Sequence, residues 1–222
     1  MAKIRIDMHL HTARSFDCLS EPGRILEAAA ARGVDRVCVT DHNEIAAAQR
    51  LKDQFGQQII VGEEVKTAER VDVIGLYIHT LIPKGTPARE TCQRIHEQGG
   101  IVYMPHPFGN GKGAGPRLLE ELAELIDVVE VFNARLHRPE LNQQARDWAV
   151  SHGKPGGAGS DAHTLAEVGR AFVEVEPFAD TPAGFLRALR SAKVHGAAAS
   201  RAVHLASTYA KLHKVVFKGK PA

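Results

Sequence analysis

The sequence predicts an α/β protein whose strands form a closed or nearly closed barrel with helices outside it. Short apolar runs alternate with helical patterns along most of the chain, which favours a parallel sheet covered by helices. Polar residues gather where the expected strands end, and the carboxyl ends of the strands are where α/β barrels carry their chemistry. With about seven strands along the chain, a closed barrel is favoured over an open sheet.

The expected strands are short apolar runs bounded by turn residues, and the last is rich in glycine. In chain order they are 3–10, 35–41, 57–65, 71–78, 101–107, 127–134 and 154–163. The expected helices carry apolar residues at helical spacing. They are 20–33, 43–56, 86–100, 116–126, 139–153 and 181–192, with a further helix in the C-terminal segment 201–222. Ser20 and Asn43 are the expected N-caps of the first two helices, and Thr181 and Pro182 begin the sixth.

The composition indicates one globular domain. The 222 residues are 44% apolar and 24% charged, which suits a single barrel domain over 1–222 with a core of roughly 1–200. The net charge of +2, from 28 basic and 26 acidic residues, argues against a general nucleic-acid binder. The C-terminal lysines are expected to form a solvated tail, and they are Lys211, Lys214, Lys218 and Lys220.

Cysteine spacing and hydropathy indicate the cellular compartment in which we expect the protein. The three cysteines are widely spaced and form no CxxC pair, which favours a reducing cytoplasm. No apolar run approaches the length needed to span a membrane, and the N-terminus lacks the long apolar segment of a signal peptide. We therefore expect a cytoplasmic protein without a membrane partner.

Every expected strand carries an imidazole, a carboxylate or another polar group, in most cases at its end. In chain order these residues are His9, His11, Asp41, His42, Glu63, Glu64, Asp72, His106, Asn133, Arg135, Asp161 and His163. Residues two apart on a strand point the same way, about 6.5 Å apart, so His9 and His11 can face one centre. Converging imidazoles and carboxylates need a compensating charge, and a mixed nitrogen and oxygen set suits zinc, iron or manganese.

Each of these motifs also has an ordinary structural explanation. A single His-x-His pair is weak evidence for metal, Asp41 or Asp161 can cap a helix, and paired glutamates can be exposed. The joint pattern favours a metal centre, because independent accidents would not all fall at strand ends. The Gly-rich segment 108–116 lacks the P-loop spacing and is expected to be a surface loop or a lid over a pocket.

The ordered motifs resemble the PHP (polymerase and histidinol phosphatase) family. The matching stretches run from Asp7 to His163 and read DMHLHTARSFD, VTDHN, GEEV, DVIGL, PHP and GSDAH. The resemblance implies a distorted (β/α)7 TIM-like barrel with its active site at the carboxyl ends of the strands. It also implies two to three divalent ions (manganese, iron or zinc) and phosphoester hydrolysis.

The resemblance implies nine metal ligands in three overlapping groups. They are His9, His11, Glu64 and Asp161 for one ion, Glu64, Asp72 and His106 for a second, and Asp17, His42 and His163 for a third. Glu64 is preferred over Glu63 because it directly precedes the small apolar residue of the motif. Many members have histidine where this chain has Asp72, and the change to a hard oxygen ligand favours manganese or iron at that position.

The function expected from this site is metal-dependent hydrolysis of a small phosphomonoester, of the nucleotide or histidinol phosphate type, by a metal-bridging hydroxide. Asp41 is expected to orient a ligand. Four residues are expected to contact the phosphate or the leaving group, and they are Arg14, Lys112, Arg135 and His137. Arg135 is preferred, because a guanidinium can bind phosphate with two hydrogen bonds, and a salt bridge is its alternative role. Two other functions stay open, an exonuclease acting on single-stranded nucleic-acid ends and a non-catalytic metal-stabilised domain.

Overall fold

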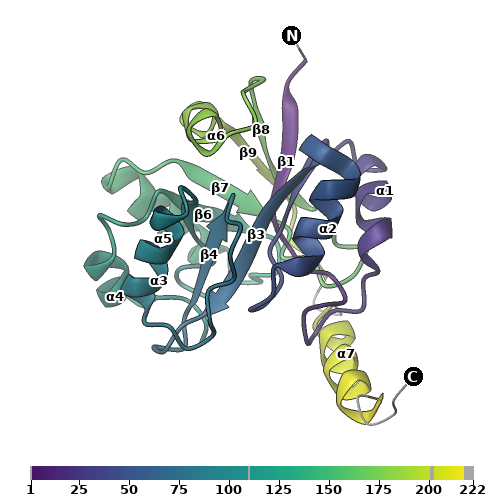
Figure 1. Cartoon of the computed structure of the whole chain (residues 1–222). Helices are drawn as coiled ribbons and strands as arrows, with labels where there is room; N and C mark the ends of the chain where they lie inside the picture. Colours follow the sequence, from purple (N-terminus) through teal and green to yellow (C-terminus); the bar gives the residue numbers. More distant parts are fainter. Residues whose placement is uncertain (1, 110, 201–202, 218–222) are drawn as a thin grey trace.

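A computed structural model describes residues 2–109, 111–200 and 203–217 of the chain. Within these residues nine strands form one sheet in the order β7-β6-β5-β4-β3-β2-β1-β8-β9, and the helices lie outside it (Figure 1). The strands are β1 (Ile4–Leu10), β2 (Arg36–Val39), β3 (Ile59–Lys66), β4 (Asp72–Leu76), β5 (Ile101–Met104), β6 (Val128–Asn133), β7 (Gly156–Gly159), β8 (Ala171–Val175) and β9 (Lys193–Gly196). The helices are α1 (Ile25–Ala30), α2 (Ala46–Phe55), α3 (Ala88–Glu97), α4 (Gly115–Glu121), α5 (Pro139–Ser151), α6 (Pro182–Leu189) and α7 (Val203–Phe217), with 3-10 turns at Pro22–Arg24 and Gly56–Gln58.

The predicted α/β barrel is confirmed, but the expectation of a parallel sheet of about seven strands is wrong. The sheet is mixed, because β4 is antiparallel to both β3 and β5, and β8 is antiparallel to β1 and β9. The connection 67–71 between β3 and β4 is too short for a crossover, so these strands can pair only as a hairpin. Strands β8 and β9 were not predicted from the sequence, and they extend the sheet beyond β1.

The barrel closes where the end of β7 meets the end of β1. The Asp161 N–H donates to the His9 carbonyl at 2.7 Å, and the His11 N–H donates to the Ala162 carbonyl at 2.9 Å. Gly159 permits this approach, since a Cβ built there would lie 2.3 Å from the His9 Cβ. The closure therefore places Asp161 directly beside the two histidines of β1.

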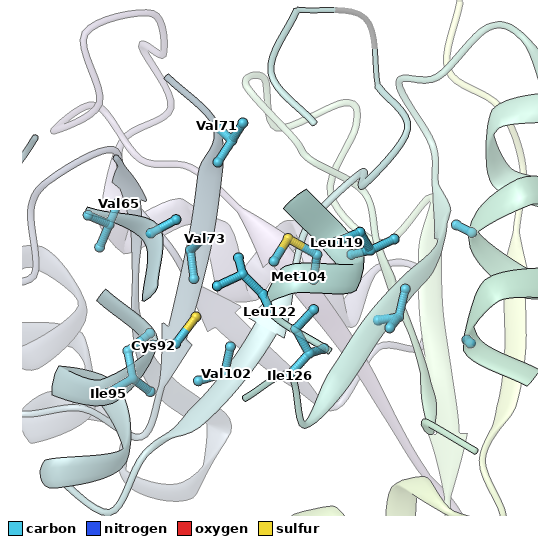
Figure 2. Packing of buried hydrophobic residues seen from close by; sticks show 14 of the residues in the cluster. Val65, Val71, Val73, Cys92, Ile95, Val102, Met104, Leu119, Leu122 and Ile126 are labelled. Atoms are coloured by element: carbon cyan, nitrogen blue, oxygen red, sulfur yellow. The ribbon is translucent and has the colours of Figure 1, made fainter. Parts of the chain in front are cut away.

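Helices α3 and α4 cover the outer face of the sheet around β4 and β5. Figure 2 shows Cys92 and Ile95 of α3 packing toward Val73 and Val102, and Leu119 of α4 near Met104 of β5. These apolar side chains are buried, and the apolar area that they remove from water is the main stabilising term for this half of the barrel. The polar strand ends are thus carried by a rigid, well-packed scaffold.

The predicted N-caps of α1 and α2 are wrong, and the predicted start of α6 is confirmed. Helix α1 begins after the 3-10 turn at Pro22–Arg24, so Ser20 lies outside it. The Glu44 carboxylate, and not Asn43, accepts from the first N–H groups of α2, while the Asn43 amide oxygen accepts from the Lys66 N–H. Thr181 caps α6 by accepting from the Gly184 N–H at 3.1 Å.

The C-terminal helix α7 lies against the carboxyl end of the barrel. In Figure 1 the N-terminus and α7 are at opposite ends of the molecule, and β1 runs toward the α7 end. Lys214 donates to the carbonyls of Ala13 and Ser15, and the Lys211 ammonium lies 3.7 Å from Asp17 Oδ2. The expectation of a solvated tail is therefore wrong for Lys214, which loop carbonyls hold, whereas the Lys211 side chain is 46% exposed. Lys218 and Lys220 lie outside the described residues.

No helix in the described residues combines the length and the apolar character needed to cross a bilayer.

The contact between Gly159 and His9 can be tested by adding one methyl group. Gly159→Ala is expected to lower the free energy of unfolding by about 1–3 kcal/mol, because the new Cβ overlaps the His9 Cβ. Gly23→Ala is the control, since nothing lies within 4 Å of a Cβ at that position. Chemical denaturation measures both variants, and equal stabilities would contradict the close approach.

Candidate metal centre

Histidine and carboxylate side chains from five strand ends converge at one end of the barrel. His9 lies on β1 and His11 directly after it, His42 follows β2, Glu64 lies near the end of β3, and His106 follows β5. The loop after β7 adds Asp161 and His163, and the loop after β1 adds Asp17. All of these residues are nearly or fully buried except Asp161, whose side chain is 16% exposed.

One group consists of His9, His11, Glu64 and Asp161, the four residues expected to hold the first ion. His9 Nε2 and His11 Nε2 lie 3.2 Å apart, and each lies 3.4–3.5 Å from Glu64 Oε2. Asp161 Oδ1 lies 3.7 Å from His9 Nε2 and 3.2 Å from His11 Nε2. The sequence-based grouping of these four side chains thus agrees with their placement.

The spacing and chemistry of this group fit a divalent ion. Ligand atoms about 2.1 Å from a tetrahedral ion lie about 3.4 Å from one another, which is close to the spacing of these four atoms. Glu64 Oε2, Asp17 Oδ1, His42 Nε2 and both carboxylate oxygens of Asp72 are buried without a hydrogen-bond partner among the described residues. Buried polar atoms left in this state are costly, and a bound cation removes that cost.

A second group brings together Asp17, His42 and His163, as expected for another ion. Asp17 Oδ1 lies 3.6 Å from His42 Nε2 and 3.3 Å from His163 Nε2. His11 adjoins this group, and ligand atoms of His11, His42 and His163 all lie within 4.8 Å of one another. Glu64 connects the two groups, because its Oε2 also lies 2.9 Å from His42 Nδ1.

The expected set of Glu64, Asp72 and His106 is only partly assembled. His106 Nε2 lies 3.1 Å from Glu64 Oε1, and these two side chains group with His9. Asp72 belongs to none of the candidate ligand groups found among the described residues. Its carboxylate instead lies 2.7 Å from the ammonium of Lys66, a residue that was not predicted as part of the site.

Two of the clustered residues have a strained backbone conformation. His106 and Asp161 have φ values of 28° and 52°, in the left-handed region that residues other than glycine rarely adopt. Such conformations cost about 1–3 kcal/mol each and persist only where surrounding contacts hold them. Both residues are held, since the His106 N–H donates to Glu130 Oε2 at 2.7 Å and the Asp161 N–H donates to His9.

The charges of the cluster shift its pKa values. Burial lowers the pKa of His42, but Glu64 and Asp17 outweigh burial and raise it to about 10. Burial likewise opposes a charged His9, yet Glu130 and other carboxylates raise its pKa well above the usual range. Burial raises the pKa of Glu64, and the neighbouring histidines reverse this effect and hold it well below its usual range. Without metal, His9 and His42 are thus stabilised as protonated rings paired with carboxylates, whereas burial and the neighbouring His163 and His42 lower the pKa of His11 well below its usual range.

Asp41, which was predicted to orient a ligand, lies behind His11. Its Oδ1 accepts from the Ser15 hydroxyl at 2.6 Å and from the Thr12 N–H at 2.7 Å. The Ser15 hydroxyl oxygen in turn lies 3.2 Å from His11 Nδ1. Asp41 therefore fixes the loop after β1 and acts on His11 through Ser15.

Glu130 is a positioning residue that sequence reasoning missed. Its Oε1 lies 3.1 Å from His9 Nδ1 and accepts from the Tyr103 hydroxyl at 3.1 Å, and its Oε2 accepts from Asn133 Nδ2 at 2.9 Å. A carboxylate on the second nitrogen of a ligating histidine fixes the ring and raises its basicity. The signal was the single charge in the apolar run VVEVF of β6.

The candidate metal centre opens into a pocket of about 380 Å³. The predicted residues Lys112, Arg135 and His137 line it, and Lys211 of α7 adds a cation that was not predicted there. Arg14 lies in a neighbouring hollow with His42 and Lys214. Burial opposes the charge of Lys112, but Glu64 and other carboxylates raise its pKa, so it is a cation at the pocket wall.

Arg135, the preferred phosphate contact, already bonds to protein groups. Its Nε lies 3.3 Å from Glu167 Oε1, and its Nη2 donates to the Ser207 hydroxyl at 2.7 Å. The residue is 8% exposed. These contacts match the alternative role of a salt bridge, and they attach α7 to the barrel beside the pocket.

Two family descriptions match the chain. Residues 7–150 match the PHP domain, and residues 139–194 match the description PHP-associated. The chain belongs to the PHP domain family. Within this family its relatives include uncharacterized protein MJ1587 of Methanocaldococcus jannaschii, which is 36% identical over 145 residues, or 59% of this chain and 82% of that protein. The predicted family is confirmed.

Solved structures of other proteins share the PHP fold. A two-domain protein from Bacteroides vulgatus, containing a predicted PHP-like metal-dependent phosphoesterase, superposes with a TM-score of 0.70 at 18% identity over 95% of this chain and 70% of that one. A lesion-specific endonuclease from Pyrococcus furiosus superposes with a TM-score of 0.62 at 18% identity over 86% of this chain and 57% of that one. Family and fold together agree with the predicted class, a metal-dependent phosphoesterase.

The choice of Glu64 over Glu63 predicts different effects for two neighbouring variants. Glu64→Gln is expected to lower the divalent-metal content, because this carboxylate faces four histidines and is a ligand of the ion at His9 and His11. Glu63→Gln is the matched control and is expected to retain the metal, since Glu63 Oε2 accepts from the Ile82 N–H away from the cluster. The metal content of both variants is measured by mass spectrometry. A metal-free Glu63→Gln protein with a metal-bound Glu64→Gln protein would assign the ligand role to Glu63 instead.

The raised pKa of His42 predicts a pH-dependent stability for the metal-free protein. Its folded pKa of about 10 exceeds the usual 6.5, so the stabilisation is full below pH 6.5 and is lost as the pH rises toward 10. Denaturation in the presence of a chelator should show this loss between these two pH values. His42→Asn should flatten the profile, and parallel profiles for the two proteins would be evidence against the ion pairs of His42.

Proposed function

We propose that this protein is a divalent-metal-dependent phosphatase that hydrolyses a small phosphomonoester of the nucleotide or histidinol phosphate type. The observation that carries the proposal is a cluster of buried metal-ligating side chains at the base of a pocket with cationic walls. The volume of about 380 Å³ lies in the range of small-ligand pockets, about 300–1,000 Å³. Lys112 and Lys211 line this pocket and favour an anionic ligand.

The ligands that we propose are the seven side chains of the two assembled groups, and His106 supports Glu64 from the side of β5. The seven ligands are His9, His11, Asp17, His42, Glu64, Asp161 and His163. When bound, divalent ions such as manganese, iron or zinc supply an activated water or hydroxide and neutralise the charge of the phosphate. The mixed nitrogen and oxygen set suits these metals.

The other polar residues of the site have positioning and binding roles in this proposal. Asp41 and Glu130 hold the rings of His11 and His9 in place, which keeps the nitrogen atoms directed at the cluster. Lys112 binds the phosphate as a point charge. His137, at the wall of the same pocket, is placed to contact the leaving group.

A phosphodiester at a nucleic-acid end is the second candidate substrate. Its support is the basic rim formed by Lys112, Lys211 and Arg138, together with the fold shared with Endonuclease Q, whose structure holds a duplex with an abasic lesion at the active site. A small substrate is favoured, because Ser207 and Lys211 of α7 line the pocket and narrow the space beside the ligand cluster.

A substrate panel tests the proposal. The protein is assayed with manganese, iron or zinc on p-nitrophenyl phosphate, mononucleotides, histidinol phosphate and short single-stranded oligonucleotides. We expect metal-dependent release of phosphate from at least one monoester, and loss of this activity in His42→Ala and His106→Ala, because both rings contact Glu64. Cleavage of the oligonucleotides alone would favour the nuclease, and no activity on any compound would overturn the enzymatic proposal.

The role of Lys112 gives a further prediction. Lys112→Ala is expected to raise KM for the best monoester about tenfold, since a charge-assisted contact contributes roughly 1.5 kcal/mol or more. Lys3→Ala is the control, because Lys3 precedes β1 at the other end of the strand from His9 and pairs with Glu174. Steady-state kinetics would contradict the role of Lys112 if both variants kept the wild-type KM.

A further inference from the structure

The family resemblance implies that Asp72 is a metal ligand, but in the structure its carboxylate contacts the ammonium of Lys66. The Asp72 side chain is fully buried, and the Lys66 ammonium lies 2.7 Å from its Oδ1. Lys66 and Asp72 are directly opposite each other in the antiparallel pairing of β3 and β4. The hairpin that brings Asp72 to the site therefore also brings a lysine against it.

The ammonium of Lys66 is held in place by a second contact. It donates to the Arg70 carbonyl at 3.2 Å, within the turn that joins β3 to β4. The same turn is closed by the Thr67 N–H, which donates to the Val71 carbonyl at 2.9 Å. The Lys66 side chain is only 26% exposed, so a carbonyl and a carboxylate fix it at the edge of the cluster.

The Lys66 side chain lies on the same face of the sheet as the Glu64 side chain. These two residues are two apart on β3, so their side chains point to the same side. An ammonium compensates the buried negative charge of Asp72, which is the task that a metal ion performs for the other carboxylates. A divalent ion ligated by Asp72 would have to displace this ammonium or lie close to it, and like charges at such distances repel strongly.

We infer that Lys66 takes the place of one metal ion, so that this centre holds two divalent ions where the family resemblance implies three. The inference rests on the proposed function for the existence of the metal centre. One ion is held by His9, His11, Glu64 and Asp161, and the other by Asp17, His42 and His163. Asp72 is paired with the lysine at 2.7 Å, and His106 stays bonded to Glu64 as a supporting side chain.

The number of bound ions is the direct test. The full-length protein is titrated with manganese, and free manganese is followed by electron paramagnetic resonance, which counts the equivalents bound without measuring catalysis. We expect two equivalents for the wild type. Lys66→Met should bind three, because it frees a buried carboxylate beside Glu64 and His106.

A second variant covers the case in which Lys66→Met does not fold with an unpaired buried charge. The double variant Lys66→Met with Asp72→His removes that charge and supplies the histidine that many family members have, so it should also bind three equivalents. Lys52→Met is the matched control and should bind two. Lys52 makes the same kind of contacts elsewhere, 2.8 Å from Asp180 Oδ2 and 3.0 Å from the Ile59 carbonyl.

Three results are decisive against the inference. Three equivalents in the wild type, or two in both Lys66 variants, would show that the lysine does not replace an ion. A wild type that binds no manganese would instead overturn the proposed function, and the inference with it.

Discussion

The carboxylate of Glu64 is the contact on which the rest of the site depends. Its Oε2 lies 2.9–3.5 Å from nitrogens of His9, His11 and His42, and its Oε1 lies 3.1 Å from His106. These four histidines come from β1, from the loop after it, and from the ends of β2 and β5. No other side chain in the described part of the chain is shared by both candidate ligand groups and His106 in this way. A single residue at the end of β3 thus joins the two ends of the ligand cluster.

The surrounding structure holds these side chains in an arrangement that costs free energy without a bound ion. Buried imidazole and carboxylate groups lose their hydration, and only the ion pairs between them recover part of that loss. Glu130, Asp41 and Asp7 form the layer behind the cluster. Asp7 accepts from the Ser160 and Gly169 N–H groups, both at 2.9 Å, and so ties β1 to the loop that carries Asp161. Rigidity behind the ligands is what allows the cluster to form before any ion binds.

The sequence was informative where local pattern decides structure. The strand ends could be located from short apolar runs. The ordered motifs predicted a ligand set, and the side chains of His9, His11, Glu64 and Asp161, predicted as one group, lie together in the structure. The C-terminal position of α7 was also expected, since 201–222 was predicted to contain a helix. The family resemblance, more than any single motif, gave the ligand set its specificity.

The features that could not be predicted depend on contacts between distant segments. The pairing of Lys66 with Asp72 follows from the hairpin register of β3 and β4, which neither residue reveals alone. The engagement of Arg135 by Glu167 and Ser207 depends on where α7 lies, and a guanidinium read in isolation suggested a phosphate contact instead. The role of Glu130 needed the placement of β6 beside His9. In each case the missing information was tertiary pairing and not local propensity.

The central claim is that Glu64 lies at the middle of a divalent-metal centre. Anomalous diffraction from crystals of the manganese-loaded protein tests it most directly, because the signal locates the ions without reference to activity. The account predicts one anomalous peak in contact with the Glu64 carboxylate beside His9 and His11, and a second peak next to it among Asp17, His42 and His163. Peaks remote from Glu64, or no peaks in crystals grown with saturating manganese, would contradict it.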